Sequence, residues 1–402
     1  MCGALLALAS VASGQAAWPA GGAGAHGLSV QQDARGLRAS AVAGHVAGQA
    51  ASSGESSFSL VPAAWAALGP FGGDIADVQV SPLNANIVLA ALAPSAGGGG
   101  LYRSMDGGST WNPVATLANV ACYDLAFAPD GTAYAATIDG VWKSTNSGTS
   151  FAALNLGIGL NDQVIDVDVD PTNPLRLWCG VADAIGSQPV NVMLSINGGT
   201  TWANKTPPLG GATTCTGVAI DPANNLHVYA CFGGAFGGGQ VWGSTNGGTT
   251  WTNHSAGLPN NPMQDVVFDG ARVLVAGGQL FGTQNVGLYA SVNDGVTWTP
   301  LHDGSWPVLV INDIALDPND PNLILAGSAG SGVFRSTDDG LTWSFGAGGT
   351  GSLSVNSVSF APGSSSLVFT GSSSNAIWKS TDAAASFAPS SDGIGALDVF
   401  SV

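Results

Sequence analysis

One eight-residue pattern recurs seven times along this 402-residue chain. It has the form Ser-x-Asp/Asn-x-Gly-x-Thr/Ser-Trp/Phe, and we call each copy a box. The first copy runs from Ser104 to Trp111. The others occupy residues 144–151, 195–202, 244–251, 291–298, 336–343 and 380–387, and Ala384 replaces the glycine in the last copy. The first serines of successive boxes are 40 to 51 residues apart, so a structural unit of that length repeats along the chain.

Short apolar segments with a period of two lie between the boxes and predict strands. Ahead of box six, for example, residues 313–318, 322–327 and 332–336 follow one another. A repeat of this length suits four antiparallel strands. The sequence therefore predicts an all-β fold, a seven-bladed β-propeller of four-stranded antiparallel blades over residues 60–402. Residues 65–68 or 396–402 are expected to complete the ring, unless the chain is part of a longer array.

Each box is predicted to close a tight hairpin between the third and fourth strands of a blade. Its Asp or Asn side chain can accept backbone N–H bonds across the turn, and its glycine permits a positive φ. This structural role is assigned to Asp106, Asn146, Asn197, Asn246, Asn293, Asp338 and Asp382. In a meander the first and third turns share one face, which we call the lower face. A ligand is therefore expected on the opposite, upper face.

The boxes resemble the Asp-box (BNR) repeat of sialidases, xyloglucanases, sortilin-type receptors and the photosystem II assembly factor. The resemblance covers about residues 60–402, and seven copies in register imply the propeller fold. It implies no single function, because those relatives do unrelated things.

The N-terminal region differs in composition from the repeats. Residues 1–17 are apolar and end in small residues, as in a signal peptide, although the usual basic start is missing. Residues 18–59 are rich in Ala, Gly, Ser and Gln, which predicts a flexible leader. We therefore expect a secreted protein, periplasmic or extracellular. No membrane span is expected, because no long apolar run occurs elsewhere.

Charge restricts the partners of this chain. It has 26 acidic residues against 9 Lys and Arg, a net charge of −17, so nucleic acid is not an expected partner. The only glutamate is Glu55, outside the repeats. A glycan or an extracellular protein remains as a partner, and the chain is expected to be a monomer without a cofactor.

Export would make disulfides available to the four cysteines of the repeats. Cys215 and Cys231 are equidistant from the turn at residues 221–225, which predicts a bridge across one hairpin. A second bridge is predicted between Cys122 and Cys179. The alternative is that all four are buried free thiols.

Five aspartates begin the innermost strands of five blades and are expected to encircle the channel entrance. They are Asp77, Asp124, Asp166, Asp265 and Asp313. They could attract a cation there or raise one another's pKa. The alternative is that each accepts backbone N–H bonds from the adjoining loop. His302 and Trp306, in the long loop before blade six, could offer stacking for a sugar, or Trp306 could fold onto the channel mouth.

The resemblance to two enzyme families can be tested on the residues. Sialidases use three arginines, a Tyr–Glu pair and an Asp acid, whereas this propeller has no Glu and only seven basic residues. Four of these seven immediately precede a box serine, which indicates a structural role: Arg103, Lys143, Arg335 and Lys379. Sialidase activity is therefore not expected. Xyloglucanases use two aspartates, and the stretch matching their first, residues 93–100, has no carboxylate.

These observations favour a secreted, non-catalytic module that binds a glycan or a protein on its upper face. One alternative is a xyloglucanase-like glycoside hydrolase that uses paired aspartates as acid and base. Another is a structural extracellular module.

Overall fold

The computed structural model describes residues 29–33, 36–40, 74–93, 99–154, 162–183, 191–209, 214–233, 238–279, 284–373 and 376–394. The chain divides into two compact units at residues 68 and 69. In the first unit, β1 (Ser29–Asp33) pairs with β2 (Gly36–Ser40) as an antiparallel hairpin. This hairpin lies inside the stretch predicted to be a flexible leader. The rest of that stretch and the predicted signal peptide lie outside the described residues.

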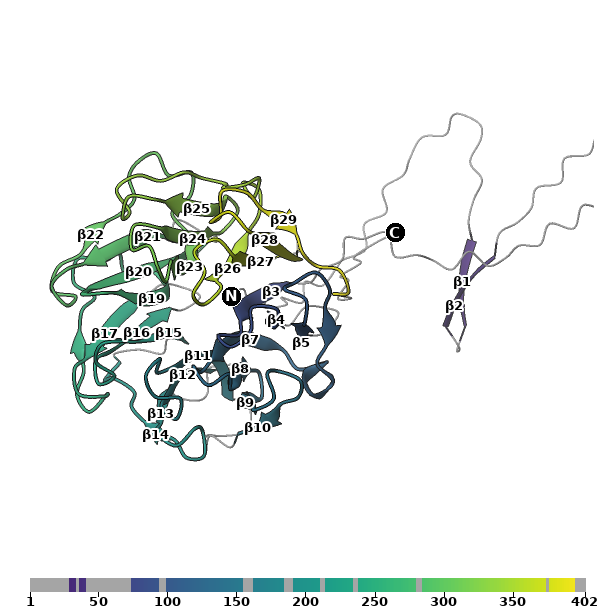
Figure 1. Ribbon diagram of the computed structural model, residues 1–402, viewed down its shortest axis with the longest axis horizontal. Helices are drawn as coiled ribbons and strands as arrows, with labels where there is room; N and C mark the ends of the chain where they lie inside the picture. Colours follow the sequence, from purple (N-terminus) through teal and green to yellow (C-terminus); the bar gives the residue numbers. More distant parts are fainter. Residues whose placement is uncertain are drawn as a thin grey trace, which may run out of the picture. The chain divides into compact units, whose positions relative to one another are not determined.

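The second unit consists of seven antiparallel sheets arranged as blades around a common centre (Figure 1). Each blade is a meander of consecutive strands, so it uses one continuous segment of the chain. Blade one has β3 (Ile75–Val80), β4 (Val88–Leu92), β5 (Gly100–Ser104) and β6 (Asn112–Pro113), followed by a 3₁₀ turn, η1 (Ala115–Leu117). Blade two has β7 (Cys122–Phe127), β8 (Ala133–Thr137), β9 (Gly140–Ser144) and β10 (Ala152–Ala153). Blade three has β11 (Asp162–Val169), β12 (Leu177–Asp183), β13 (Asn191–Ser195) and β14 (Ala203–Asn204).

The remaining four blades repeat this plan. Blade four has β15 (Thr214–Ile220), β16 (Val228–Gly233), β17 (Gln240–Ser244) and β18 (Thr252–Asn253). Blade five has β19 (Met263–Asp269), β20 (Arg272–Gln279), β21 (Gln284–Ser291) and β22 (Thr299–Pro300). Blade six has β23 (Ile311–Leu316), β24 (Ile324–Ser328) and β25 (Gly332–Ser336). Blade seven has β26 (Val355–Phe360), β27 (Val368–Ser372), β28 (Ala376–Ser380) and β29 (Ala388–Pro389).

The predicted all-β, seven-bladed propeller is confirmed. In blade six the outermost strand is reduced to a single bridge between Arg335 and Ser344. Each sheet packs against a neighbouring blade on both of its faces, and apolar side chains from the two blades fill the space between them. None of the helices in the described part of the chain has the length and apolarity needed to cross a membrane.

The ring closes by direct contact between blades seven and one. Asn356 Nδ2 donates to Ile75 O at 2.8 Å, and Trp111 Nε1 donates to Ser390 O at 2.6 Å. Lys379 Nζ donates to Gly107 O at 2.6 Å. Every strand assigned to blades one and seven comes from that blade's own segment. The segments predicted to complete the ring, residues 65–68 and 396–402, lie outside the described residues.

All seven innermost strands share a bulge close to their first residue. In blade one the register shifts between Ile75 and Asp77, and the same shift occurs in the other six blades. A bulge places two residues opposite one, so the alternation of side chains between the two faces is reset there. This feature decides where several of the predicted site residues lie.

Candidate functional site

The five predicted channel acids follow the bulges directly. Each reaches across a junction and accepts a hydrogen bond from a backbone N–H of the next blade's innermost strand. The bonds run from Leu125 N to Asp77 (3.1 Å), Val167 N to Asp124 (2.8 Å), Val218 N to Asp166 (2.9 Å), Ile314 N to Asp265 (2.9 Å) and Val358 N to Asp313 (2.6 Å). An innermost strand is an edge strand, whose N–H groups on that edge have no sheet partner. The carboxylates therefore satisfy the channel edge and join neighbouring blades.

The two remaining junctions lack an aspartate at this position. At the junction of blades seven and one, Val78 N donates to Ser357 Oγ at 3.3 Å, and Ser357 Oγ donates to Asp77 Oδ1 at 2.6 Å. Blade four has Gly217 instead, and Thr216 Oγ1 donates to Met263 O in blade five at 2.9 Å. All seven junctions thus carry a polar link close to the channel.

Burial raises the pKa of all five channel acids. The charge of neighbouring carboxylates raises the pKa of Asp124, Asp166 and Asp313 further. A sixth acid, Asp168, lies two residues beyond Asp166, accepts from Ile220 N at 3.1 Å, and has its pKa raised by burial to about 7. The channel therefore holds protons on carboxyl groups at pH values where an exposed Asp is ionised.

This arrangement favours the alternative in which the aspartates accept backbone N–H bonds over a cation site. It differs from that expectation in one respect. The N–H partners belong to the next blade rather than to the adjoining loop. Among the described residues, no group of three or more His, Cys, Asp or Glu side chains is arranged to hold a metal ion. The channel acids therefore stabilise the ring by joining neighbouring blades, rather than by holding a cation.

His302 and Trp306 lie in an aromatic cluster between blades five and six. Trp306 is 8% exposed and packs edge-on against Phe334, Trp343 and Phe345. His302 Nδ1 lies 3.0 Å from Leu288 O. Trp306 fills space beside the reduced outer edge of blade six. The placement of Trp306 in the core removes the stacking surface that the sequence suggested.

The four predicted disulfide cysteines are free and buried. The bulge at Thr216 separates Cys215 from Cys231: Cys215 pairs with Phe232, whereas Cys231 pairs with Gly217. The two side chains therefore point to opposite faces of the sheet, Cys215 toward blade three and Cys231 toward blade five.

The second predicted pair is divided in the same way. Cys122 packs with residues of blade one, whereas Cys179 packs with residues of blade two, so the sheet of blade two separates them. Neither predicted bridge is present in the structure.

Polar bonds inside each box hold its turn. In box one, Thr110 N donates to Asp106 Oδ1 at 2.8 Å and Gly108 N donates to Ser104 Oγ at 2.8 Å. The Asp or Asn accepts the corresponding N–H in the other six boxes as well. Ala384 keeps the positive φ of the glycine that it replaces, at 61°.

Basic side chains link the boxes of neighbouring blades. The four residues that precede a box serine each donate to a carbonyl in the next box: Arg103 to Ser147 O (2.7 Å), Lys143 to Gly198 O (3.0 Å), Arg335 to Ala383 O (2.8 Å) and Lys379 to Gly107 O (2.6 Å). Arg272 bonds both Asp269 in its own blade and Asp339 in box six. Most of the propeller's positive charge therefore stabilises junctions.

A histidine network at the junction of blades four and five was not predicted from the sequence. His227 Nδ1 lies 3.0 Å from Asp221 Oδ2, and His227 Nε2 lies 2.9 Å from Asp294 Oδ1. Tyr229 OH donates to the same Asp294 oxygen at 2.7 Å. Asp294 has φ 56° and occupies the fourth box position, which is glycine in boxes one, three and four. An acid at a left-handed turn position was the signal that could have revealed this contact.

These features define a β-propeller whose channel and lower face are tied together by its charged residues. No family model and no curated protein matches the chain. Among solved structures, YCF48 bound to D1 peptide has a TM-score of 0.56 and 15% identity, covering 78% of this chain and 93% of that one. YCF48 from Cyanidioschyzon merolae has a TM-score of 0.55 and 18% identity, covering 77% and 96%. At these identities the similarity establishes the fold alone.

Two glycoside hydrolases are also similar to the chain. The GH74 enzyme of Niastella koreensis has 17% identity and a TM-score of 0.43, and the match covers 79% of this chain and 62% of that one. The GH74 xyloglucanase from Xanthomonas campestris has 15% identity and a TM-score of 0.43, covering 79% and 58%. The chain thus spans less than two thirds of either enzyme.

Proposed function

We propose that this protein is an exported, non-catalytic binding module that takes a glycan or a protein segment on the upper face of its propeller. The observation that carries the proposal is that the channel and box aspartates are engaged in structural hydrogen bonds. The channel carboxylates accept backbone N–H bonds across the junctions, and the box carboxylates hold turns. A general acid or base must instead be free to approach a substrate. Binding by upper-face loops needs no such group.

A protein ligand receives support from one structural neighbour. The propeller of similar fold with a TM-score of 0.56 is YCF48 with a bound D1 peptide. We extend that mode of action, a propeller that works by binding, to this chain. A ligand is expected between the second and third strands of the blades, and residues 94–98, 184–190 and 234–237, which fall there in the sequence, lie outside the described residues.

Glycoside hydrolysis stays as the second candidate because of one observation. The raised pKa of Asp168, about 7, is typical of a carboxyl group that could donate a proton near neutral pH. A hydrolase of this kind would use it with a second channel acid.

Glycan and peptide arrays, combined with a reducing-end assay on xyloglucan and bacterial polysaccharides, test the proposal. We expect saturable binding without turnover. Upper-face Asp139→Ala and Asp303→Ala should weaken binding, whereas the matched lower-face changes Asp130→Ala and Asp320→Ala should not. All four side chains are exposed, so the variants should fold. Turnover that disappears in Asp168→Asn would establish the hydrolase instead. Absence of any binding, or loss of binding in the lower-face variants alone, would also contradict the proposal.

A further inference from the structure

The lower face of the propeller exposes aliphatic side chains. Eight large hydrophobic residues are exposed in the described part of the chain, and all eight lie on lower turns or boxes. Exposed fractions reach 82% at Leu341 and 76% at Val292. Six of the eight belong to four consecutive blades, three to six, whose lower turns and boxes we call the lower arc. They are Leu175, Ile196, Leu226, Val292, Val296 and Leu341. Grouped exposure of this kind is typical of an interaction surface.

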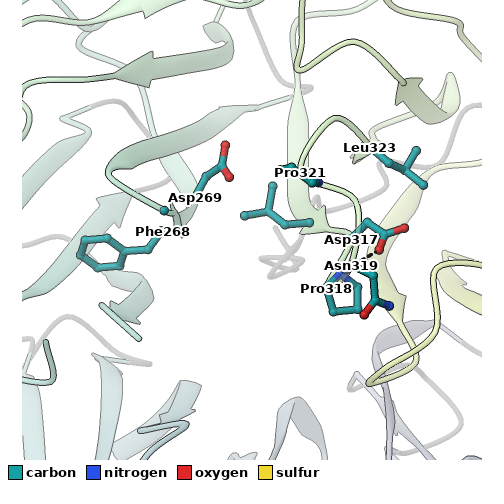
Figure 2. Close-up of a pocket in the computed structure, with 9 residues that line it drawn as sticks. Phe268, Asp269, Asp317, Pro318, Asn319, Pro321 and Leu323 are labelled. Atoms are coloured by element: carbon teal, nitrogen blue, oxygen red, sulfur yellow. Dashed lines mark hydrogen bonds between the residues drawn. The ribbon is translucent and has the colours of Figure 1, made fainter. Parts of the chain in front are cut away.

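Two cavities open on the same arc. The first, of about 260 Å³, lies between the lower turns of blades five and six. Figure 2 shows Phe268 and Asp269 on one side of it and Pro318 and Pro321 on the other. The second, of about 270 Å³, lies between boxes four and five and is lined by residues such as His254. Small-molecule pockets usually measure about 300–1,000 Å³, so these cavities suit single side chains of a larger partner.

The charge of the arc is one-sided. Its lower turns and boxes, in blades three to six, contain eight carboxylates and two arginines, Arg176 and Arg272. The eight are Asp170, Asp221, Asp269, Asp294, Asp317, Asp320, Asp338 and Asp339. Asp294 and Asp339 remain 50% and 47% exposed although Asp294 contacts His227 and Asp339 contacts Arg272. A partner that covers this surface must therefore bring positive charge with its apolar groups.

We propose that the lower arc docks a basic protein segment, whose aliphatic side chains cover the exposed residues and enter the first cavity. A second copy of this chain fits less well, because it would bring another net charge of −17 against an acidic surface. The proposal concerns the face opposite to the expected ligand site, so it stands or falls independently of the proposed function.

Two synthetic peptides of equal length, one of alternating Lys and Leu and one of alternating Glu and Leu, provide the probe. Binding to the full chain is measured by fluorescence anisotropy at physiological salt. We expect the Lys-Leu peptide to bind and the Glu-Leu peptide not to bind. The double variant Val292→Ser/Leu341→Ser should weaken binding at least about fivefold, the effect of truncating an important interface residue. Asp320→Asn on the arc should weaken binding more than Asp139→Asn on the upper face, although each removes one charge.

Hydrogen exchange on the unmodified protein gives a measurement that needs no variant. Protection on peptide binding is expected at residues 291–298 and 317–323. Equal effects of Asp320→Asn and Asp139→Asn would indicate unspecific attraction to an acidic protein and would overturn the proposal. Failure of the Lys-Leu peptide to bind, or protection elsewhere, would overturn it too. A dimer in light scattering that disappears in the double variant would assign the arc to self-association instead.

Discussion

The buried channel acids predict an unusual dependence of stability on pH. Burial raises the pKa of Asp168 to about 7 and that of Asp265 to about 6. An Asp in an unfolded chain has a pKa of about 3.9. Above this value the unfolded chain has lost protons that the folded protein still holds, so a rise in pH favours unfolding. The stabilising contribution is complete below about pH 4 and is lost as pH rises through the folded pKa values.

The size of the effect follows from the number of protons. One additional proton bound by the folded state changes the free energy of unfolding by about 1.4 kcal/mol per pH unit. Near pH 5 both Asp168 and Asp265 hold a proton only in the folded state, which gives a decline of about 2.7 kcal/mol per pH unit. The raised pKa values of Asp124, Asp166 and Asp313 act in the same direction. Box acids such as Asp382, whose pKa is lowered by hydrogen bonds to about 2, act in the opposite direction only at lower pH.

Urea unfolding followed by tryptophan fluorescence, between pH 5 and 7.5 at constant ionic strength, measures this slope. We expect Asp168→Asn to reduce the slope by about 1.4 kcal/mol per pH unit up to pH about 6.5. Asp320→Asn, which removes an exposed turn carboxylate, should keep the slope of the parent protein and so controls for the change in total charge. A parent protein that becomes more stable as pH rises from 5 to 7.5, or equal slopes for the two variants, would refute the argument.

Three further results are expected. Lys143→Met should cost about 1 kcal/mol in urea unfolding, because it removes a charged hydrogen bond to the next box, whereas Lys143→Arg should keep the bond; equal losses would contradict this role. Gly148→Ala should destabilise by at least about 1 kcal/mol more than Gly257→Ala, since both have positive φ but only the Gly148 methyl would meet Leu89, at 2.6 Å. The four buried thiols should resist alkylation until the protein unfolds, as burial raises the pKa of Cys122 to about 12, and intact mass after alkylation should show no disulfide; rapid native alkylation would contradict this burial.

The repeat carried most of the information on the fold. Seven boxes at nearly even spacing predict seven blades, because a serine, an Asp or Asn and a glycine at fixed offsets make one type of turn. The bulges could not be predicted from the spacing of the boxes along the sequence. A single inserted residue reverses the face of every side chain on one side of it, so Cys215 and Cys231 appear opposed in the sequence and lie on different faces in the structure.

The location of the candidate site could be predicted from the sequence, but the hydrogen-bond partners of its aspartates could not. The start of the innermost strand placed Asp77 and its equivalents around the channel, but their partners lie one blade away, 43 to 52 residues along the chain. Trp306 illustrates the other limit. A loop aromatic is indistinguishable from a core aromatic until its contacts with Trp343 and Phe345, beside the reduced outer edge of blade six, are known.

The contiguity of each blade has a consequence for folding kinetics. Junction bonds within the array join residues that are close in sequence, such as Asp77 and Leu125, 48 positions apart. The bond from Ser357 to Asp77 spans 280 positions. Closing so large a loop costs more conformational entropy than forming any other junction, and slow folding accompanies distant contacts. Blades should therefore assemble in sequence order as an open arc, and the closing junction should form last and open first.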